Sequence, residues 1–506
     1  MKRQKIKLRI EPLGKEILVN ENTPLKDIVH EFGVEFPCGG EGYCGGCKVK
    51  LLSGDVIDPE KHEELNYKLG LDENYRLSCI SKLCEDITIE IPQLESIVLA
   101  DNSTYNFTPR EGFGIAVDLG TTTIVSQLID LTNGSVVDVQ TSRNPQTRFG
   151  SDIMSRIMHG MTEEGKEKSQ TLIRDEIYNM VQSLIEKRKI DLTKIIIVGN
   201  TVMHHLFCGF DITPLGSYPF ETKNNHSVEL NPKELGWELN GNVKIIFVKP
   251  IASFIGSDIL AGVLASGMNE NLHLTALVDL GTNGEIVVGN NEKIVCASTA
   301  AGPAFEGTNI KMGMSAMTGA ISSVNYENNK VDFHVIGNQD ALGICGSGLI
   351  DATMVFLQNE SIDYGGAIIT ENEKLAIGSR VYMTQKDIRE FQLAKAAIAA
   401  GMQILVNKLG KNLSDITRVY IAGGFGNFLN LENVTKLGML EVDEYKIKKL
   451  GNSALIGAKM LLFYDDYSFE EILNKVEHVS LDADPSFQDI FVDKMFFENY
   501  GGVETK

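Results

Sequence analysis

The spacing of hydrophobic residues changes near residue 112 and divides the chain into two parts. Before that point, a short helix is predicted between Pro24 and Phe32. Apolar and polar residues alternate around it, as they do in half-buried strands, at residues 4–11, 15–20, 47–52 and 87–91. The first part is therefore predicted to be a small domain of two strands, a helix, a loop and returning strands.

The second part combines apolar strands with longer amphipathic helices. Between Leu172 and Lys187, six apolar residues recur at the spacing of one helical face. Another helix is predicted to follow Thr384 and to run to Gly410, with Asp387 in a capping-box position. This combination is typical of an α/β fold.

A repeated segment indicates that the second part is duplicated. Residues 114–130 and 275–290 share the sequence VDLGT, and each copy is followed by a second strand, a turn and a third strand. The turns are predicted at Asn133-Gly134 and Asn290-Asn291, residues that favour tight hairpins. A repeat of this length predicts two similar lobes that face each other.

Between the two parts lies a polar stretch without periodicity, bounded by Pro92 and Pro109. Such a composition is typical of a linker. We therefore expect a first domain at residues 1–92, a flexible linker at 93–111, lobe one at 112–273 and lobe two at 274–506. The C-terminal helices of lobe two are expected to return to lobe one.

Charge and composition limit the partners of this protein. The 506 residues include 47 Lys and Arg and 68 Asp and Glu, for a net charge of −21. Such a surplus disfavours nucleic acid and anionic membrane as partners. The first residues lack the apolar core of a signal peptide, and no stretch approaches 18 uninterrupted apolar residues. We expect a cytoplasmic protein whose eight cysteines do not form a disulfide framework.

The closest group of potential metal ligands in the sequence lies in the loop CGGEGYCGGC, at residues 38–47. Cys38, Cys44 and Cys47 are separated by five and two residues, with five glycines between them. Three close thiolates and a distant fourth are typical of a [2Fe–2S] cluster, because glycines let backbone amides approach the sulfurs. Cys79 is the preferred fourth ligand, although Cys84 competes by spacing alone. A zinc site of four cysteines is the main alternative.

These segments resemble the adrenodoxin branch of the ferredoxins. The resemblance includes the spacing of the first three cysteines and the segment YRLSC, which ends at Cys79. It implies a β-grasp domain that holds a [2Fe–2S] cluster and transfers single electrons.

The two VDLGT segments have the chemistry of phosphate-binding turns. Each places an aspartate, Asp118 or Asp279, at the end of a strand, where it can hold Mg²⁺ through water. Small residues then let backbone N–H groups surround a phosphate, and hydroxyl and amide groups add donors. The expected phosphate contacts are Gly120, Thr121, Thr122 and Thr123 in lobe one, and Gly281, Thr282, Asn283 and Gly284 in lobe two.

A third Gly-rich segment completes a nucleotide site. The strand within Val419–Leu429 ends in Gly423, Gly424 and Gly426, where missing side chains let a nucleoside lie on the backbone. Together, the three segments resemble the ASKHA superfamily of sugar kinases, heat-shock chaperones and actin. The resemblance implies a two-lobed domain that binds ATP. Asn200 and Asp258 are the two candidates for orienting the attacking water, and helix capping is an equally valid role for either.

A ferredoxin domain and an ASKHA domain in one chain resemble the reductive activators of corrinoid proteins. Further matching segments are SRNPQTRFGSDIMSRI and MTQKDIREFQLAKAAI. The resemblance implies ATP-dependent reduction of inactive Co(II) to Co(I) in a corrinoid protein of a methyltransferase or acetogenic system. It also implies an external low-potential electron donor, and it allows a homodimer. The short linker leaves no room for an extra middle domain.

Other functions remain open from the sequence. One is a small-molecule kinase with an appended redox-sensing ferredoxin domain, which would phosphorylate a substrate. Another is an iron–sulfur electron carrier with degenerate nucleotide binding. The activators of 2-hydroxyacyl-CoA dehydratases are a third comparison, but they lack a ferredoxin module.

Overall fold

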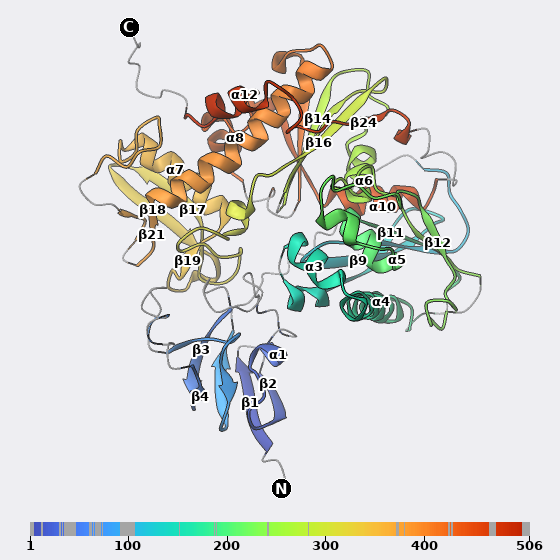
Figure 1. The fold of residues 1–506 in the computed structure, drawn as a ribbon, viewed down its shortest axis with the longest axis horizontal. Helices are drawn as coiled ribbons and strands as arrows, with labels where there is room; N and C mark the ends of the chain where they lie inside the picture. Colours follow the sequence, from blue (N-terminus) through green and yellow to red (C-terminus); the bar gives the residue numbers. More distant parts are fainter. Residues whose placement is uncertain are drawn as a thin grey trace.

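The structure is a computed structural model of the chain (Figure 1). It describes residues 5–11, 14–29, 32, 34, 47–59, 63, 65, 72, 74–91, 107–150, 152–186, 188, 190–239, 242–281, 283–370, 374–378, 380–423, 426, 429–464 and 472–497.

The N-terminal domain contains a five-stranded sheet in the order β2-β1-β7-β3-β5. Its elements are β1 Lys5–Glu11, β2 Lys15–Asn20, α1 Lys26–Val29, β3 Lys48–Ser53, β5 Tyr75–Leu77 and β7 Ile87–Glu90, with the short pair β4 Val56–Ile57 and β6 Lys82–Leu83 beside them. β1 and β7 are parallel, and the other neighbours are antiparallel. Alternate residues of β1, such as Leu8 and Ile10, are fully buried in its core. The predicted β-grasp arrangement is confirmed.

Lobe one is built on a six-stranded sheet in the order β10-β9-β8-β11-β13-β12. The strands are β8 Phe113–Leu119, β9 Thr123–Asp130, β10 Val136–Arg143, β11 Leu192–Gly199, β12 Val228–Leu230 and β13 Lys244–Phe247. The helices are α3 Ile153–Gly160, α4 Glu163–Ile185, α5 Thr201–Cys208 and α6 Ser257–Ser266. The apolar face of α4 packs on one side of the sheet with α3 and α5. This is the amphipathic helix that the sequence predicts at 172–187, extended at its N-terminus.

Lobe two has a sheet in the order β23-β22-β14-β15-β16-β24. The strands are β14 Thr275–Leu280, β15 Gly284–Gly289, β16 Ile294–Thr299, β22 Arg418–Ala422, β23 Ile447–Gly451 and β24 Val476–His478. Smaller sheets contain β17 Ala320–Glu327, β18 Lys330–Val335, β19 Gly343–Ile344, β20 Lys374–Ala376 and β21 Tyr382–Thr384. The helices are α7 Gly346–Gln358, α8 Gln385–Lys408, α9 Leu431–Lys436, α10 Ser453–Leu461 and α12 Phe487–Lys494. α8 begins at the predicted capping box of Thr384 and Asp387.

The strand orders of the two lobes confirm the duplication. The order β10-β9-β8-β11-β13 in lobe one is repeated as β16-β15-β14-β22-β23 in lobe two. In both lobes an antiparallel three-stranded meander is followed by parallel neighbours. The VDLGT segments therefore occupy equivalent places, at the ends of β8 and β14.

The two lobes share one apolar core around the crossing of α6 and α10. α6 follows the lobe-one sheet, and α10 comes from the C-terminal part of the chain, yet they pack together between the two sheets (Figure 1). A Cβ atom at Gly457 would lie 2.0 Å from the carbonyl oxygen of Ala261. The two helices therefore cross so closely that no side chain fits at Gly457, and their contact joins the two lobes.

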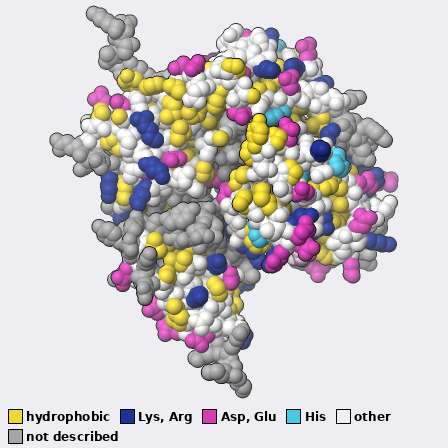
Figure 2. Space-filling view, viewed as in Figure 1, with side chains coloured by type: hydrophobic (Ala, Val, Ile, Leu, Met, Phe, Trp, Pro, Cys, Tyr) yellow, Lys and Arg dark blue, Asp and Glu magenta, His cyan; other side chains and the backbone are white. Residues whose placement is uncertain are grey.

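The surface reflects the acidic composition. Acidic side chains are spread over the visible face, with basic side chains between them (Figure 2). Among the residues that the structure describes, no helix is both long and apolar enough to cross a membrane.

Candidate cluster and nucleotide sites

Adjacent strands bring two of the predicted cluster ligands together. Cys47 precedes β3 and Cys79 follows β5, and these strands are antiparallel neighbours. Ser78 holds the two segments, because its N–H and its hydroxyl both donate to the carbonyl oxygen of Cys47, at 3.1 and 2.8 Å. The two Sγ atoms are 3.1 Å apart and buried. This is well beyond a disulfide bond of about 2.05 Å, so the two sulfur atoms converge without forming a bond to each other.

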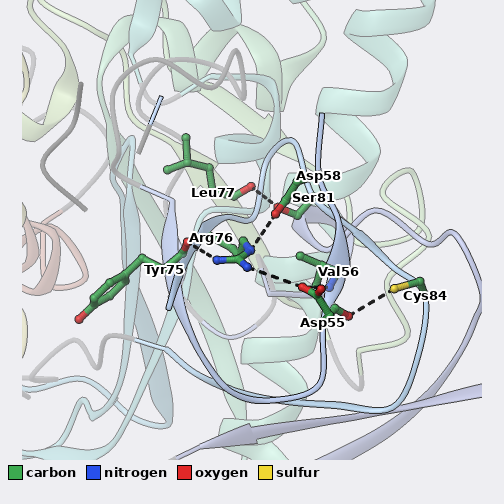
Figure 3. Close-up of polar contacts among 8 residues, drawn as sticks. All are labelled: Asp55, Val56, Asp58, Tyr75, Arg76, Leu77, Ser81 and Cys84. Atoms are coloured by element: carbon green, nitrogen blue, oxygen red, sulfur yellow. Dashed lines mark hydrogen bonds and ion pairs between the residues drawn. The ribbon is translucent and has the colours of Figure 1, made fainter. Parts of the chain in front are cut away.

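The competing cysteine lies in a different environment. Cys84 is partly exposed, and its Sγ is 3.4 Å from the carbonyl oxygen of Asp55 (Figure 3). Cys38 and Cys44 lie outside the described residues. The geometry therefore favours Cys79 over Cys84 as the partner of Cys47, and ligation by all four cysteines stays a prediction.

A buried ion pair supports the turn that contains Cys79. Arg76 Nε lies 2.7 Å from the carboxylate of Asp58, and both side chains are less than 15% exposed (side-chain exposures 14% and 8%). The other oxygen of Asp58 accepts a hydrogen bond from Ser81, whose hydroxyl also donates to the carbonyl of Leu77 (Figure 3). Because residues on both sides of Cys79 are held in this way, its thiol has a fixed direction.

The phosphate turn of lobe one is held by asparagines from two other segments. Asn200 caps α5 and donates a hydrogen bond of 2.8 Å to the hydroxyl of Thr121. Asn144 donates from its backbone to the carbonyl of Thr122 and from its side chain to the carbonyl of Gly120. The turn is thus shaped before any ligand binds, which reduces the cost of binding.

The carboxylate of Asp118 is fixed by a residue that lies more than 300 positions later in the chain. Asn452, the N-cap of α10, donates a 2.8 Å hydrogen bond to its carboxylate. Asn452 follows Gly451, whose carbonyl accepts from the N–H of Gly423 in the third Gly-rich segment. Asn452 therefore links the first phosphate turn to the expected nucleoside site. The sequence alone does not reveal this contact, because an asparagine at a helix start is ordinary capping chemistry.

The second phosphate turn approaches the Gly-rich segment closely. Asp279 is the register partner of Ala422 on β22, so the turn and the end of that strand lie side by side. Gly423 follows with φ +87°, and a Cβ there would lie 2.9 Å from an Asp279 carboxylate oxygen. Only glycine suits this position. Gly281, Asn283, Gly284 and Gly426 are also described, whereas Thr282 and Gly424 lie outside the described residues.

Carboxylates from both lobes lie close enough to affect one another's pKa. Burial raises the pKa of Asp118 to about 6. Burial, and then the charge of Asp118, raise the pKa of Asp279 to about 6. Burial and the charges of both raise the pKa of Asp258 to about 7. The structure thus brings Asp118, Asp258 and Asp279 together, and their mutual repulsion would be relieved by a cation.

The chemistry of these donors fits Mg²⁺ held through water. Carboxylate oxygens are the ligands that Mg²⁺ prefers, and this ion usually keeps several waters. In the part of the chain that the structure describes, no three Asp, Glu, His or Cys side chains are close enough to hold an ion directly. Asp118 and Asp279 fit an outer layer around a hydrated ion.

Comparison with known proteins agrees with this architecture. Three family models match: the 2Fe-2S iron-sulfur cluster binding domain at residues 8–84, the RACo middle region at 113–271, and the C-terminal domain of RACo, the ASKHA domain, at 273–503. The corrinoid activation enzyme RamQ of Eubacterium limosum is 32% identical over 443 residues, which cover 80% of this chain and 74% of RamQ. The chain belongs to the family of reductive activators of corrinoid proteins.

Other members and a solved structure extend this result. The [Co(II) methylated amine-specific corrinoid protein] reductase of Methanosarcina barkeri is 28% identical, over 77% of this chain and 78% of that protein. The solved structure of a reductive activator for corrinoid, iron-sulfur protein matches with a TM-score of 0.66 and 27% identity, covering 97% of this chain and 98% of that chain. The middle region of the family falls on lobe one here.

The cysteine geometry predicts how two single variants differ. Cys79→Ala removes a thiol that converges with Cys47, so we expect it to lose the [2Fe–2S] absorption and the reduced-state EPR signal. Cys84→Ala, the matched control, should keep both, because the Cys84 sulfur is partly exposed and lies 3.4 Å from the carbonyl oxygen of Asp55. Iron and sulfide content of the purified proteins checks the result. Cluster loss in Cys84→Ala with retention in Cys79→Ala would reverse the assignment.

The raised pKa of Asp258 predicts a pH-dependent gain from Asp258→Asn. Because the folded-state pKa of about 7 lies well above the ordinary aspartate value of 3.8, native stability is lost as pH rises from about 4 through 7. Asparagine does not ionise, so the Asp258→Asn variant does not lose this stability as pH rises. Without nucleotide or Mg²⁺, its stability advantage should therefore be about 1–2 kcal/mol larger at pH 8 than at pH 5.

Chemical denaturation followed by fluorescence of the single tryptophan, Trp237, measures this difference, because Trp237 is buried in lobe one. Asp332→Asn, an exposed site on β18, is the control and should show no pH-dependent difference. An advantage of Asp258→Asn that is equal at both pH values would contradict the account.

Proposed function

We propose that this protein is an ATP-dependent reductive activator that returns the Co(II) form of a corrinoid protein to Co(I). The observation that supports it most strongly is the presence, in one chain, of a converging Cys47–Cys79 pair and of facing carboxylates from two phosphate turns. Relatives named as a corrinoid activation enzyme and a Co(II) corrinoid protein reductase support the choice of substrate.

The N-terminal domain delivers the electron. Cys38, Cys44, Cys47 and Cys79 are the residues that hold the cluster, and a bound [2Fe–2S] cluster supplies one electron at a time. An external low-potential reductant provides that electron, and Co(II) in the partner accepts it to become Co(I). The transfer needs no proton from this chain. The buried Arg76–Asp58 pair keeps the Cys79 turn in place throughout.

The two lobes bind Mg-ATP between them. The turns at Gly120–Thr123 and Gly281–Gly284 face the phosphates, the segment at Gly423 faces the nucleoside, and Asp118 and Asp279 hold the hydrated ion. Asn200 is fixed by Thr121 and orients the attacking water. Nucleotide and corrinoid protein must both favour the same closed state, because a ligand that binds two states equally shifts neither.

The N-terminal domain needs freedom to reach the partner. Among the described residues, an ion pair of Asp72 and Arg380 at 3.8 Å connects that domain to lobe two, and the two side chains are 58% and 61% exposed. Such a pair contributes only about 0–1 kcal/mol. We therefore assign the 93–111 linker the role of a tether. We also propose that the protein is cytoplasmic and that its partner is a methyltransferase or acetogenic corrinoid protein. This function requires neither nucleic acid nor a membrane.

The direct test is spectroscopic. Purified protein, a low-potential reductant and a cognate Co(II) corrinoid protein should give Co(I) absorption with Mg-ATP, and much more slowly without nucleotide. Cys79→Ala should abolish it while ATP still binds, since the sites are separate. Asp118→Asn should slow it while the cluster spectrum is retained. Equal rates with and without nucleotide would reject the ATP dependence, and no Co(I) with any cognate partner would reject the function.

A further inference from the structure

Helix α3 of lobe one has exposed methionines along its outer face. Met154 and Met158 are 45% and 62% exposed, and residues four apart lie on the same side of a helix. Met161 continues this stripe, because its Cε atom would lie 2.1 Å from a Cβ atom at Gly216. Hydrophobic side chains gather on the visible face over α3 (Figure 2). The apolar edge of α3 therefore continues onto the segment that contains Gly216.

Two aromatic side chains extend this surface. Tyr218 is 89% exposed, and its ring centroid lies 6.3 Å from that of Phe220, which in turn lies 6.1 Å from that of Phe254. Phe220 has φ +61°, a strained conformation for a bulky residue, and such strain is concentrated at functional sites. Aromatic and methionine side chains are enriched where proteins bind one another. We define the lobe-one patch as Met154, Met158, Tyr218 and Phe220.

The segment with the aromatic residues is fixed from beneath by two buried histidines of α5. His205 Nε2 lies 2.7 Å from the hydroxyl of Thr222, and His204 Nε2 lies 3.2 Å from the carbonyl oxygen of His226. The patch is thus shaped before a partner binds, which reduces the cost of binding. α5 begins at Asn200, the residue that holds the first phosphate turn, so one helix contacts both the patch segment and the nucleotide site.

The inner face of α3 also reaches the residues that shape this turn. Arg156, which is buried on the side of α3 opposite the exposed methionines, has a guanidinium nitrogen 3.9 Å from Sδ of Met203. The side-chain nitrogen of Asn144 lies 3.4 Å from the same sulfur and donates to the carbonyl of Gly120 in the turn. α3 therefore lies between the patch and the nucleotide site, in contact with both.

We propose that the lobe-one patch is a docking surface for the corrinoid protein, which binds it through an apolar surface of its own. This inference rests on the proposed reductive activation and adds where the partner binds. That function requires nucleotide and partner to favour the same state. A partner on this patch meets the requirement, because α3 and α5 join the patch to the first phosphate turn.

Size distinguishes this occupant from a second copy of the chain. A stable interface buries about 800 Å² on each partner, and homodimers usually bury more. One large aromatic side chain buries about 150–250 Å², so two aromatic and two methionine side chains supply less than a stable homodimer needs. Small interfaces are typical of short-lived complexes that transfer electrons, and an activator has to release its partner after each reduction.

Biolayer interferometry of the full chain with a cognate Co(II) corrinoid protein and Mg-ATP measures docking. For the double variant Met158→Ser, Tyr218→Ser we expect the dissociation constant to rise at least about tenfold, because buried anchors dominate binding. Its cluster spectrum, melting temperature and affinity for ATP without partner should match wild type, since exposed substitutions change stability little. Tyr445→Ser is the matched control in lobe two, where this tyrosine is 76% exposed, and should bind the partner as wild type does.

Each outcome decides between definite alternatives. A dissociation constant of the double variant within about twofold of wild type, the range of a neutral surface substitution, would reject the patch and leave the proposed function intact. A change from dimer to monomer in sedimentation, with unchanged partner affinity, would assign the patch to a second copy of the chain instead. Lower ATP affinity together with a lower melting temperature would show a structural role. No partner binding and no Co(I) with wild type would reject the proposed function together with this inference.

Discussion

Negative charge from both lobes meets at one place, and the rest of the ASKHA domain depends on how that repulsion is relieved. Asp118 comes from lobe one and Asp279 from lobe two, and each raises the cost of ionising Asp258. Burial raises the pKa of all three before any neighbour acts. A protein that keeps such a cluster spends folding free energy on it, which is typical of a binding site prepared for a cation.

The same region is where the lobes are joined. α6 and α10 cross without room for a side chain at Gly457, and Asn452 at the start of α10 donates to Asp118. A cation and a triphosphate placed among these carboxylates would act directly on the elements that connect the lobes. This gives a physical route from nucleotide binding to a change in lobe arrangement, because the bound state removes repulsion that the free state contains. Among the described residues, an exposed ion pair of Asp72 and Arg380 connects the N-terminal domain to lobe two, and such a pair contributes little free energy.

The sequence predicted those features that local pattern determines. Alternation identified the strands of the N-terminal domain, and the repeated VDLGT segment identified the two phosphate turns. The helix expected at 24–32 is described at Lys26–Val29, and residues 30, 31 and 33 lie outside the described residues. The contact of Asn452 with Asp118 joins residues at opposite ends of the ASKHA domain, and a capping asparagine gives no sign of it.

The central claim is that Mg-ATP draws the two lobes together by relieving this repulsion. Pulsed EPR measures it most directly, with spin labels on unnatural amino acids at Glu229 in lobe one and Lys330 in lobe two, both exposed positions that leave the cysteines intact. We expect a shorter and narrower distance distribution with Mg-ATP, and no such change with ATP in EDTA. The same distribution in all conditions would contradict it.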